Sequence, residues 1–428
     1  MKQDCYMNKS GQPLSFPRSL LLGGAIAALS SLTPSWTPSV EATLEDSPKV
    51  VVDEVWQIVN TEFVNPKFDR AEWQDTRNDL LTRRYSDNKE AYESIRKALK
   101  KLGDPYTRFL APSEFEALSN QTSGELTGIG ITIEINEQTQ ILTVVKSLEN
   151  SPAMKAGIMA GDQIIKIGNQ QTDLMSLEQA SEAIRGEEGT EVTLELSRQG
   201  QESLVVTVTQ AIIELPSVSY DLKQEEQLKV GYIKLDEFSS HAAEQMEEAI
   251  QDLETQGAEG FVLDLRGNPG GLLFASVDIA RMWMADGDIV KTVDRRGGDR
   301  QLSANNTALT NLPLVVLVDR NSASASEILA GAFKDNGRAT IVGRNTFGKG
   351  TVQAVHSLSD GSGLAVTISR YYPPSGMDIN RRGIAPDIEV KLTRNERLRL
   401  AQNPELFATT DDPYYAQAIS ILNRNYFQ

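Results

Sequence analysis

Cysteine and histidine are almost absent from this chain, which has one Cys and two His among 428 residues. A single cysteine, Cys5, cannot form a disulfide within the chain. A zinc site built from four cysteines, or from two cysteines and two histidines, is excluded for the same reason. A hydrolase with a catalytic histidine would have to use His241 or His356.

Positive charge is also scarce. The chain has 42 Lys and Arg against 59 Asp and Glu, a formal net charge of −17, and no long basic run. Basic patches are what attract nucleic acid and anionic membrane surfaces, so neither is expected to be a partner. The length, with 40% hydrophobic and 24% charged residues, is that of an ordinary globular protein of two or three domains.

The apolar run LLLGGAIAALSSL at residues 20–32 is short for a membrane span, which needs about 20 apolar residues. Basic residues precede it, and a small-residue site ending at Ala42 follows. This is the pattern of a secretory signal, so residues 1–42 are predicted to be a signal peptide. The mature chain would then lack cysteine and have no stable membrane span. An uncleaved anchor is the alternative.

Residues 43–120 are predicted to form an N-terminal helical module. In three stretches, apolar side chains recur every three or four residues, which is the period of an amphipathic helix. The sequence Gly103-Asp104-Pro105 ends the third stretch with helix-breaking residues. The apolar side chains of the three stretches are Val51, Val52, Val55, Trp56 and Val59, then Trp73, Leu80 and Leu81, then Tyr92, Ile95, Leu99 and Leu102.

From about residue 124 the apolar period changes to that of strands. The order of expected strands and helices, the loop LTGIGI at 126–131, the turn SPAMKAGI at 151–158 and the strand GDQIIKIG at 161–168 resemble a PDZ domain over residues 124–210. Such a domain binds a peptide by adding it as a strand to a sheet edge. The loop that would receive the terminal carboxylate contains Leu126, Gly128, Ile129, Gly130 and Ile131. The alternative is a PDZ shell that only packs against its neighbour.

Residues 213–428 are predicted to be an α/β core with a C-terminal extension. Continuous apolar strands separated by helices are typical of a largely parallel sheet with helices on its faces. The expected strands are 229–235, 260–265, 314–318, 339–342 and 351–358, and the expected helices are 242–253, 272–284 and 327–333.

Two junctions of this core could carry chemistry. The turn RGNPGG at 266–271 follows a buried strand, and its glycines allow backbone N–H groups to face an anion or oxyanion. The segment NSASASE at 321–327 precedes a helix, and a serine there could be a nucleophile. Ser324-x-x-Glu327 also fits a helix capping box, which is the simpler interpretation of that segment alone.

The segment GRNTFGKG at 343–350 nearly matches a phosphate-binding loop but fails at two points. Gly350 stands where a Ser or Thr must reach Mg²⁺, and the residues that follow alternate like a strand instead of forming a helix. In a strand, Lys349, Thr351 and Gln353 would share one face. A desolvated, neutral Lys349 could deprotonate a serine, with Gln353 holding the amine.

A second serine–lysine pair, Ser94-x-x-Lys97, matches the β-lactamase motif in spacing only. It lies in a predicted helix without the partner motifs, so helix surface chemistry explains it better. The turn GIAPD at 383–387 suggests a structural role and no chemistry.

Taken together, these segments resemble the carboxyl-terminal processing proteases, a family of PDZ-bearing endopeptidases with a serine–lysine active site. The resemblance runs from about residue 50 to about residue 393. Its motifs are DPYTRFL at 104–110, the PDZ domain, DLRGNPGG at 264–271, SASASE at 322–327, TFGKGTVQ at 346–353 and GIAPD at 383–387.

The resemblance implies a multidomain α/β protein with a ClpP- or crotonase-like protease core, and it implies the residue roles. Ser324 would be the nucleophile, Lys349 the general base and Gln353 the assisting residue. The oxyanion hole would use the N–H of Ala325 and that of Gly270 or Gly271. The choice among Ser322, Ser324 and Ser326 rests on the resemblance alone. Arg185 resembles an arginine implicated in gating by the PDZ domain, and a solvated turn charge is its alternative.

The resemblance also implies a protein or peptide substrate with an accessible C-terminus and no metal or cofactor. Relatives in cyanobacteria and chloroplasts trim a photosystem II reaction-centre precursor, which makes that precursor a candidate substrate. An exported protein of the periplasm or thylakoid lumen is expected. Two alternatives stay open, a PDZ binding module with an inactive core and a crotonase-like acyl-CoA enzyme. The sequence does not indicate the oligomeric state.

Overall fold

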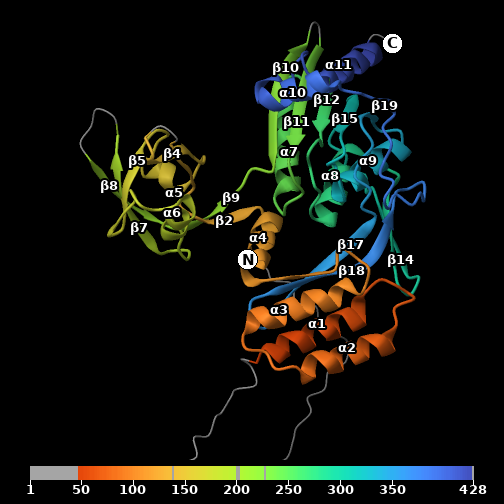
Figure 1. Cartoon of the computed structure of the whole chain (residues 1–428). Helices are drawn as coiled ribbons and strands as arrows, with labels where there is room; N and C mark the ends of the chain where they lie inside the picture. Colours follow the sequence, from red (N-terminus) through yellow and green to blue (C-terminus); the bar gives the residue numbers. More distant parts are fainter. Residues whose placement is uncertain (1–46, 137–138, 199–202, 226–227, 427–428) are drawn as a thin grey trace, which may run out of the picture. The chain divides into compact units, whose positions relative to one another are not determined.

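The computed structural model describes residues 47–426 except 137–138, 199–202 and 226–227 (Figure 1). The predicted signal peptide, residues 1–42, lies outside the described residues. Among the helices that are described, none is both long enough and apolar enough to cross a membrane.

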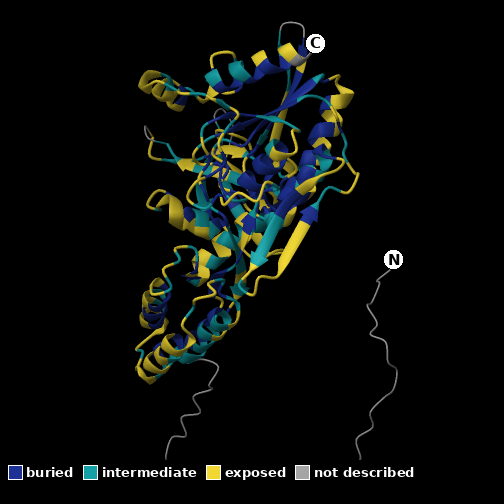
Figure 2. Ribbon diagram, turned by 90° about the vertical axis from the view of Figure 1, so that its right-hand side faces the viewer, coloured by how far each residue is buried: buried dark blue, intermediate teal, exposed yellow. Residues whose placement is uncertain are grey.

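The N-terminal module contains the three predicted helices, α1 (Pro48–Glu62), α2 (Arg70–Thr82) and α3 (Asn88–Lys100). Each begins at a polar residue whose side chain accepts a backbone hydrogen bond, namely Ser47, Asp69 and Asp87. Their apolar faces pack against one another and against Leu364 and Val366 of the α/β core. Figure 2 shows these helices with buried inner faces and exposed outer ones.

One strand of this module was not predicted. β1 (Arg108–Leu110) pairs antiparallel with β18 (Gly363–Tyr372), so the module adds a strand to a sheet of the core. Three residues are too few for an alternating pattern to be visible in the sequence. The next helix, α4 (Pro112–Ser123), ends at Gly124, whose φ of +71° suits the left-handed cap at that point.

The PDZ domain has its own hydrophobic core, made by the buried side of its strands and of α6 (Leu177–Ile184). Its chain enters through β2 (Glu125–Gly128) and leaves through β9 (Ala211–Glu214), which pair antiparallel. Its other elements are β3 (Ile131–Ile135), β4 (Leu142–Ser147), α5 (Pro152–Lys155), β5 (Gln163–Ile167), β6 (Gln170–Gln171), β7 (Glu191–Ser197) and β8 (Leu204–Thr209).

The core contains a six-stranded sheet in the order β10-β11-β12-β15-β16-β19, in which β10 is antiparallel and the other five are parallel. This confirms the predicted α/β fold class. The strands are β10 (Val218–Glu225), β11 (Leu228–Leu235), β12 (Gly260–Asp264), β15 (Leu314–Val318), β16 (Thr340–Gly343) and β19 (Ile388–Glu389).

Alternate residues of this sheet face two different hydrophobic layers. Phe261 and Leu263 of β12 pack with α7 (Ala242–Thr255), α8 (Leu273–Trp283) and α9 (Ala325–Asp335). Val262, between them, packs on the other side with the C-terminal helix α11 (Pro413–Tyr426). Two short elements, α10 (Arg394–Gln402) and the 3₁₀ turn η2 (Pro404–Leu406), precede that helix.

A second sheet of the core has the order β1-β18-β13-β14, with β17 also paired to β18. Its remaining strands are β13 (Asp288–Asp294), β14 (Asp299–Ser303) and β17 (Thr351–Ser357). The segment after the lysine loop is therefore a strand, as predicted, and the phosphate-loop interpretation lacks the helix that it needs.

Candidate active site

The two junctions singled out in the sequence meet at the carboxyl edge of the parallel sheet. β12 and β15 are neighbouring parallel strands, so the turn after one and the loop after the other lie side by side. The buried Asn268 joins them, because its carbonyl oxygen accepts from Ala323 N and from Ser326 Oγ, each at 3.0 Å. Its side-chain amide donates to Leu235 O at 2.8 Å, which ties the turn to β11 as well.

The three serines of the SASAS run have different surroundings. Ser322 Oγ donates to Leu265 O at 2.8 Å, Ser326 Oγ donates to Asn268 O, and both residues are fully buried. Ser324 is half-buried and lines a cavity. Among the described residues, no side-chain hydrogen bond of Ser324 is present. Spacing left the choice among the three open and the resemblance indicated Ser324, which of the three is the one that lines the cavity.

The backbone at Ser324 is unusual, with φ of +54° and ψ of −111°. A non-glycine residue with positive φ outside the left-handed region carries strain on the order of 1–3 kcal/mol and persists only where the surroundings hold it. Ser324 directly precedes α9, and Gly270 packs beside it so closely that an added Cβ would lie 2.8 Å from Ser324 Cβ. The turn and the serine loop therefore fit together only with a glycine at 270.

The buried carboxylate of Glu327 holds this strained backbone. Each of its oxygens accepts two hydrogen bonds, and burial raises the pKa of its carboxyl against their opposing effect. The four donors are Thr346 Oγ1 at 2.6 Å and Gly348 N at 2.7 Å on Oε1, and Ser324 N and Lys349 N, each at 2.9 Å, on Oε2. The sequence indicated only a capping box for Glu327. The structure adds that the same carboxylate joins the serine loop to the lysine loop.

The turn GIAPD, for which the sequence suggested no chemical role, supports this junction. Ile384 N donates to Thr346 Oγ1 at 2.7 Å, and Thr346 in turn donates to Glu327. A Cβ at Gly383 would lie 2.4 Å from Thr346 O, so the close approach needs a glycine, whose φ of +72° also favours one.

Lys349 lines the same cavity as Ser324 and is half-buried. Burial lowers the pKa of its amine, and the positive charge of Arg108 lowers it further, while the carboxylates of Glu327 and Asp104 act in the opposite direction. Its Nζ lies 5.1 Å from the centre of the Tyr106 ring. These surroundings favour the neutral amine that a general base must be.

A tyrosine hydroxyl links the backbones of the two residues. Tyr371 Oη lies 3.0 Å from Ser324 O and also contacts Lys349 O. Complete burial raises the pKa of this phenol well above its usual value, so the hydroxyl stays protonated and donates. The positions of Ser324 and Lys349 are therefore fixed together by Glu327 on one side and Tyr371 on the other.

Gln353 lies in the cavity wall as part of a different network. Its Nε2 donates to Thr351 Oγ1 at 3.0 Å and to Thr367 Oγ1 at 3.3 Å, and Thr367 Oγ1 donates to Asp104 at 2.6 Å. In the described part of the chain, no hydrogen bond joins Gln353 to Lys349. The amide nitrogen is thus held by threonines, and Asp104 of the DPYTRFL motif anchors the second of them.

Strand parity covers only part of this segment. Lys349 lies two residues before β17, which begins at Thr351, so the strand does not fix the direction of its side chain. The register with β18 skips Ile368 between Val352 and Gln353, so the extra residue lies in β18. Lys349, Thr351, Val352 and Gln353 all line the cavity nonetheless.

The oxyanion donors expected from the resemblance can be compared by their hydrogen bonds. Gly270 N donates to Asn268 Oδ1 at 2.8 Å. In the part of the chain that the structure describes, the N–H groups of Gly271 and Ala325 have no acceptor. Gly271 has a φ of +142°, and a Cβ there would lie 2.4 Å from Phe238 O, so a glycine is required.

The cavity that contains these residues measures about 470 Å³. Its wall comes from the N-terminal module, from the Gly-rich turn and from β17, and its apolar part suits a peptide side chain. The apolar lining residues include Leu118, Leu272, Leu273, Ile328, Val352 and Val355.

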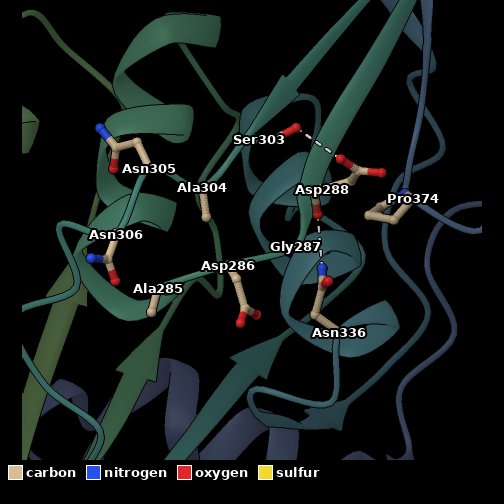
Figure 3. A pocket seen from close by; sticks show the side chains of 10 residues that line it. All are labelled: Ala285, Asp286, Gly287, Asp288, Ser303, Ala304, Asn305, Asn306, Asn336 and Pro374. Carbon is tan, nitrogen blue, oxygen red and sulfur yellow. Dashed lines mark hydrogen bonds between the residues drawn. The ribbon is translucent and has the colours of Figure 1, made fainter.

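Another cavity, of about 500 Å³, contains none of the predicted site residues (Figure 3). Its polar groups largely satisfy one another, since Ser303 Oγ donates to Asp288 Oδ1 and Asn336 Nδ2 donates to Asp288 O, each at 2.8 Å.

Neither histidine lines the Ser324 cavity. His241 is 2.9 Å from Glu125 and His356 is 2.9 Å from Glu62.

The predicted PDZ loop is partly a strand. Leu126 and Gly128 belong to β2 and pair with β9, Ile129 is buried, and Ile131 begins β3. Gly130 has a φ of +79°, and a Cβ added there would lie 2.3 Å from Ser151 Cβ. Arg185 is exposed at the end of α6, and within the described residues its side chain has no hydrogen-bond partner. The Ser94 and Lys97 pair lies within α3 and away from the cavity lining.

Comparison with known proteins gives two family matches. Residues 229–390 match the model of peptidase family S41, and residues 143–198 match that of the PDZ domain. A carboxyl-terminal-processing protease of Synechocystis sp. is 42% identical over 369 residues, which cover 86% of this chain and 85% of that protein. The chloroplastic carboxyl-terminal-processing peptidase 3 of Arabidopsis thaliana is 39% identical, over 78% of this chain and 67% of that protein.

A solved structure described as a photosystem II D1 C-terminal processing protease has the same fold. It is 36% identical, covers 81% of this chain and 93% of its own, and has a TM-score of 0.51.

Proposed function

Because the chain belongs to the carboxyl-terminal processing proteases of peptidase family S41, we propose that it is a serine endopeptidase that uses Ser324 and Lys349 to cleave proteins near their C-terminus. One observation carries this proposal. Of the three candidate serines, only Ser324 lines the cavity, and the lysine whose pKa is lowered by burial lines it too.

The proposed reaction follows the serine acyl-transfer pattern. Neutral Lys349 takes the proton of Ser324 Oγ, which attacks the scissile carbonyl and forms a C–O bond. The peptide C–N bond then breaks as the leaving amine takes a proton from Lys349. Water, deprotonated by Lys349, then attacks the carbonyl of the acyl-enzyme. The bond between that carbon and Ser324 Oγ breaks, Ser324 takes the proton back from Lys349, and the shortened protein leaves with a new carboxylate. Gln353 assists by fixing, through its hydrogen bonds to Thr351 and Thr367, the part of the cavity wall beside the amine of Lys349.

Backbone donors would stabilise the negative charge of the tetrahedral intermediates. Ala325 N at the start of α9 is one proposed donor. Of Gly270 and Gly271, the hydrogen bond from Gly270 N to Asn268 favours Gly271 as the second. One such donor contributes about 2.7–4 kcal/mol to catalysis in a known serine protease.

The PDZ domain makes the C-terminus of a substrate protein the element to be recognised. We propose residues 126–131 as the loop that binds it and Arg185 as a regulatory residue of that domain.

A photosystem II reaction-centre precursor is the candidate substrate, because a similar solved protease is described by that activity. The relatives' chloroplast and cyanobacterial origins favour an exported protein of the lumen or periplasm. Residues 43–120, 124–210 and 213–428 are the proposed domains.

A peptidase assay with a small panel of C-terminal sequences tests the proposal. Ser324→Ala and Lys349→Ala are expected to abolish cleavage and to leave the unfolding temperature close to that of the wild type. Ser326→Ala is the matched control, because it removes a buried hydroxyl of the same run; it should lower stability by about 1–3 kcal/mol and keep cleavage.

Normal turnover by Ser324→Ala would contradict the assignment. Binding of the panel without cleavage would indicate a PDZ binding module with an inactive core. Hydrolysis of acyl-CoA in place of peptides would indicate a crotonase-like enzyme.

A further inference from the structure

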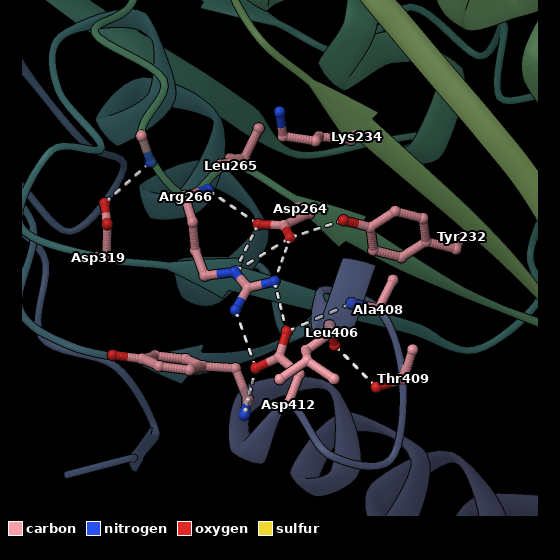
Figure 4. A network of polar contacts seen from close by, with 12 residues as sticks. Tyr232, Lys234, Asp264, Leu265, Arg266, Asp319, Leu406, Ala408, Thr409 and Asp412 are labelled. Carbon is pink, nitrogen blue, oxygen red and sulfur yellow. Dashed lines mark hydrogen bonds and ion pairs between the residues drawn. The ribbon is translucent and has the colours of Figure 1, made fainter. Parts of the chain in front are cut away.

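A buried ionic network lies behind the Gly-rich turn (Figure 4). Arg266, the first residue of the turn, pairs with Asp264 at 2.5 Å and with Asp412 at 2.8 Å. A second bond, from Arg266 Nη1 to Asp412 Oδ1 at 3.1 Å, makes the contact with Asp412 two-pronged. The exposed fractions of the three side chains are 7%, 1% and 0%, so solvent screens the network very little.

The C-terminal segment encloses the guanidinium on two further sides. The rings of Phe407 and Tyr414 both have their centres 5.0 Å from the Arg266 guanidinium carbon. Asp412 also fixes its own segment, because its carboxylate accepts from Tyr414 N at 3.1 Å and from Ala408 N at 3.4 Å. Residues 404–424 therefore surround the side chain of a residue in the Gly-rich turn.

Such a network is a poor way to gain stability. Desolvating an ion pair offsets much or all of its attraction, and apolar residues of the same size often stabilise as well or better. The arrangement is better explained by the residues that follow Arg266 in the chain. Four residues on is Gly270, which contacts Ser324, and then Gly271, a proposed oxyanion donor.

One hydrogen bond holds the turn to its own strand and a second links it to the serine loop. Arg266 N donates to Asp264 Oδ1 at 2.9 Å, and Gly267 N donates to Asp319 Oδ1 at 3.0 Å. The same oxygen of Asp319 accepts from Asn321 N at 2.9 Å and from Ser322 N at 3.1 Å. The carboxylate of Asp319 thus accepts hydrogen bonds from both the Gly-rich turn and the serine loop at the point where they leave the sheet.

We propose that Arg266 is a positioning residue, and that its pairing with Asp412 makes the C-terminal segment hold the oxyanion turn in its working geometry. The inference rests on the proposed function, since it concerns the oxyanion stabilisation of that reaction. It assigns to residues 404–424 a role in the chemical step, in addition to packing on the sheet.

The test uses the full chain with Asp412→Asn, which removes the charge and keeps the size. Asp411→Asn is the matched control, because Asp411 is the neighbouring residue and pairs with Arg399 in an exposed position. For Asp412→Asn we expect kcat to fall roughly 10- to 100-fold with KM changed less than about twofold. Asp411→Asn should match the wild type in both.

A pair of ester substrates separates positioning from general damage. One has an ordinary carbonyl at the scissile bond and the other has a thiocarbonyl, whose sulfur is a weak hydrogen-bond acceptor. The wild type should strongly prefer the oxygen substrate, because only oxygen uses the oxyanion hole fully. A displaced turn should reduce this preference, whereas a smaller active fraction would slow both substrates equally.

An unchanged oxygen-to-sulfur ratio in folded Asp412→Asn would overturn the proposal. Asp412→Glu keeps the charge on a longer side chain and should fold and show an intermediate ratio. If Asp412→Asn fails to fold and Asp412→Glu has the wild-type ratio, the segment serves folding alone and the proposal is wrong. Ester hydrolysis that does not depend on Ser324 would instead contradict the proposed function.

Discussion

Two buried carboxylates support different parts of the candidate active site, and they do so by different means. Glu327 accepts four hydrogen bonds from neutral groups, two of them backbone N–H groups that belong to Ser324 and Lys349. Asp412 pairs with the charged side chain of Arg266. The first carboxylate orders the residues proposed to react, and the second orders the turn proposed to stabilise charge.

The difference shows how charge is used near the proposed base. Glu327 lies close enough to Lys349 for its negative charge to raise the pKa of the amine. The Asp264–Arg266–Asp412 network has a formal net charge of −1, but none of its three residues is among the charges that shift the pKa of Lys349. Substitutions on the Glu327 side should therefore change the pH profile, and substitutions on the Asp412 side should change the rate alone.

The largest effect is expected from Glu327→Gln. An amide nitrogen cannot accept the hydrogen bonds that one carboxylate oxygen now receives, so two buried donors lose their acceptor. We expect kcat to fall at least about 100-fold and the free energy of unfolding to fall by about 3 kcal/mol. Peptidase assays and denaturant unfolding measure the two quantities.

Glu396→Gln is the control for that variant. Thr393 and Glu396 form a capping box at the exposed start of α10, with the same spacing as Ser324 and Glu327. If a capping box only caps a helix, its substitution should lower the free energy of unfolding by about 1 kcal/mol or less and leave activity unchanged. Equal behaviour of the two variants would reduce Glu327 to a helix cap and remove the contrast with Asp412.

A smaller effect is expected from Arg108→Gln, which tests the charges around Lys349. Activity requires the neutral amine, so it rises with pH through the pKa of Lys349. Removing the positive charge of Arg108 raises that pKa, and the acidic limb of the kcat/KM profile should move to higher pH. Arg108→Lys should keep the wild-type profile. A limb that stays in place would show that burial alone sets the pKa.

Glu327→Gln and Asp412→Asn should differ in how they move the acidic limb of the kcat/KM profile against pH. In Glu327→Gln the loss of a negative charge lowers the pKa of Lys349, so the limb of the residual activity should move to lower pH. In Asp412→Asn it should not move. Any shift in Asp412→Asn comparable to that of Arg108→Gln would mean that the ionic network acts on the base electrostatically.

The smallest effect is expected from Asp411→Asn. The Arg399–Asp411 pair has more than half of each side chain exposed, and such pairs contribute about 0–1 kcal/mol. Unfolding at low and high salt should differ little between this variant and the wild type. A loss as large as that of Asp412→Asn would contradict the idea that burial distinguishes the two aspartates.

How far the sequence could predict these features depends on how local they are. Strand and helix periods indicated the α/β core, and the family motifs pointed to Ser324 and Lys349. Glu327 was visible only as a cap, because its spacing from Ser324 is the same in both roles. The pair of Arg266 and Asp412 left no signal, since 146 residues separate them and each is an ordinary charged residue in the sequence.

Geometry within a recognised motif was also beyond the sequence. Strand parity did not extend to Lys349, because the boundary of β17 at Thr351 depends on its pairing with β18. β1 was missed since three residues carry no period, yet it brings Tyr106 and Arg108 to the cavity.

The pairing of β1 with β18 also sets an order of events during synthesis. Thr367 N donates to Thr107 Oγ1 across a separation of 260 residues, so one wall of the cavity is completed only after a partner strand that is made much later. Contacts of such long range form late in folding. Asp412 emerges later still. Until β18 and the segment around Asp412 have been made, a growing chain therefore lacks the contacts that complete the proposed active site.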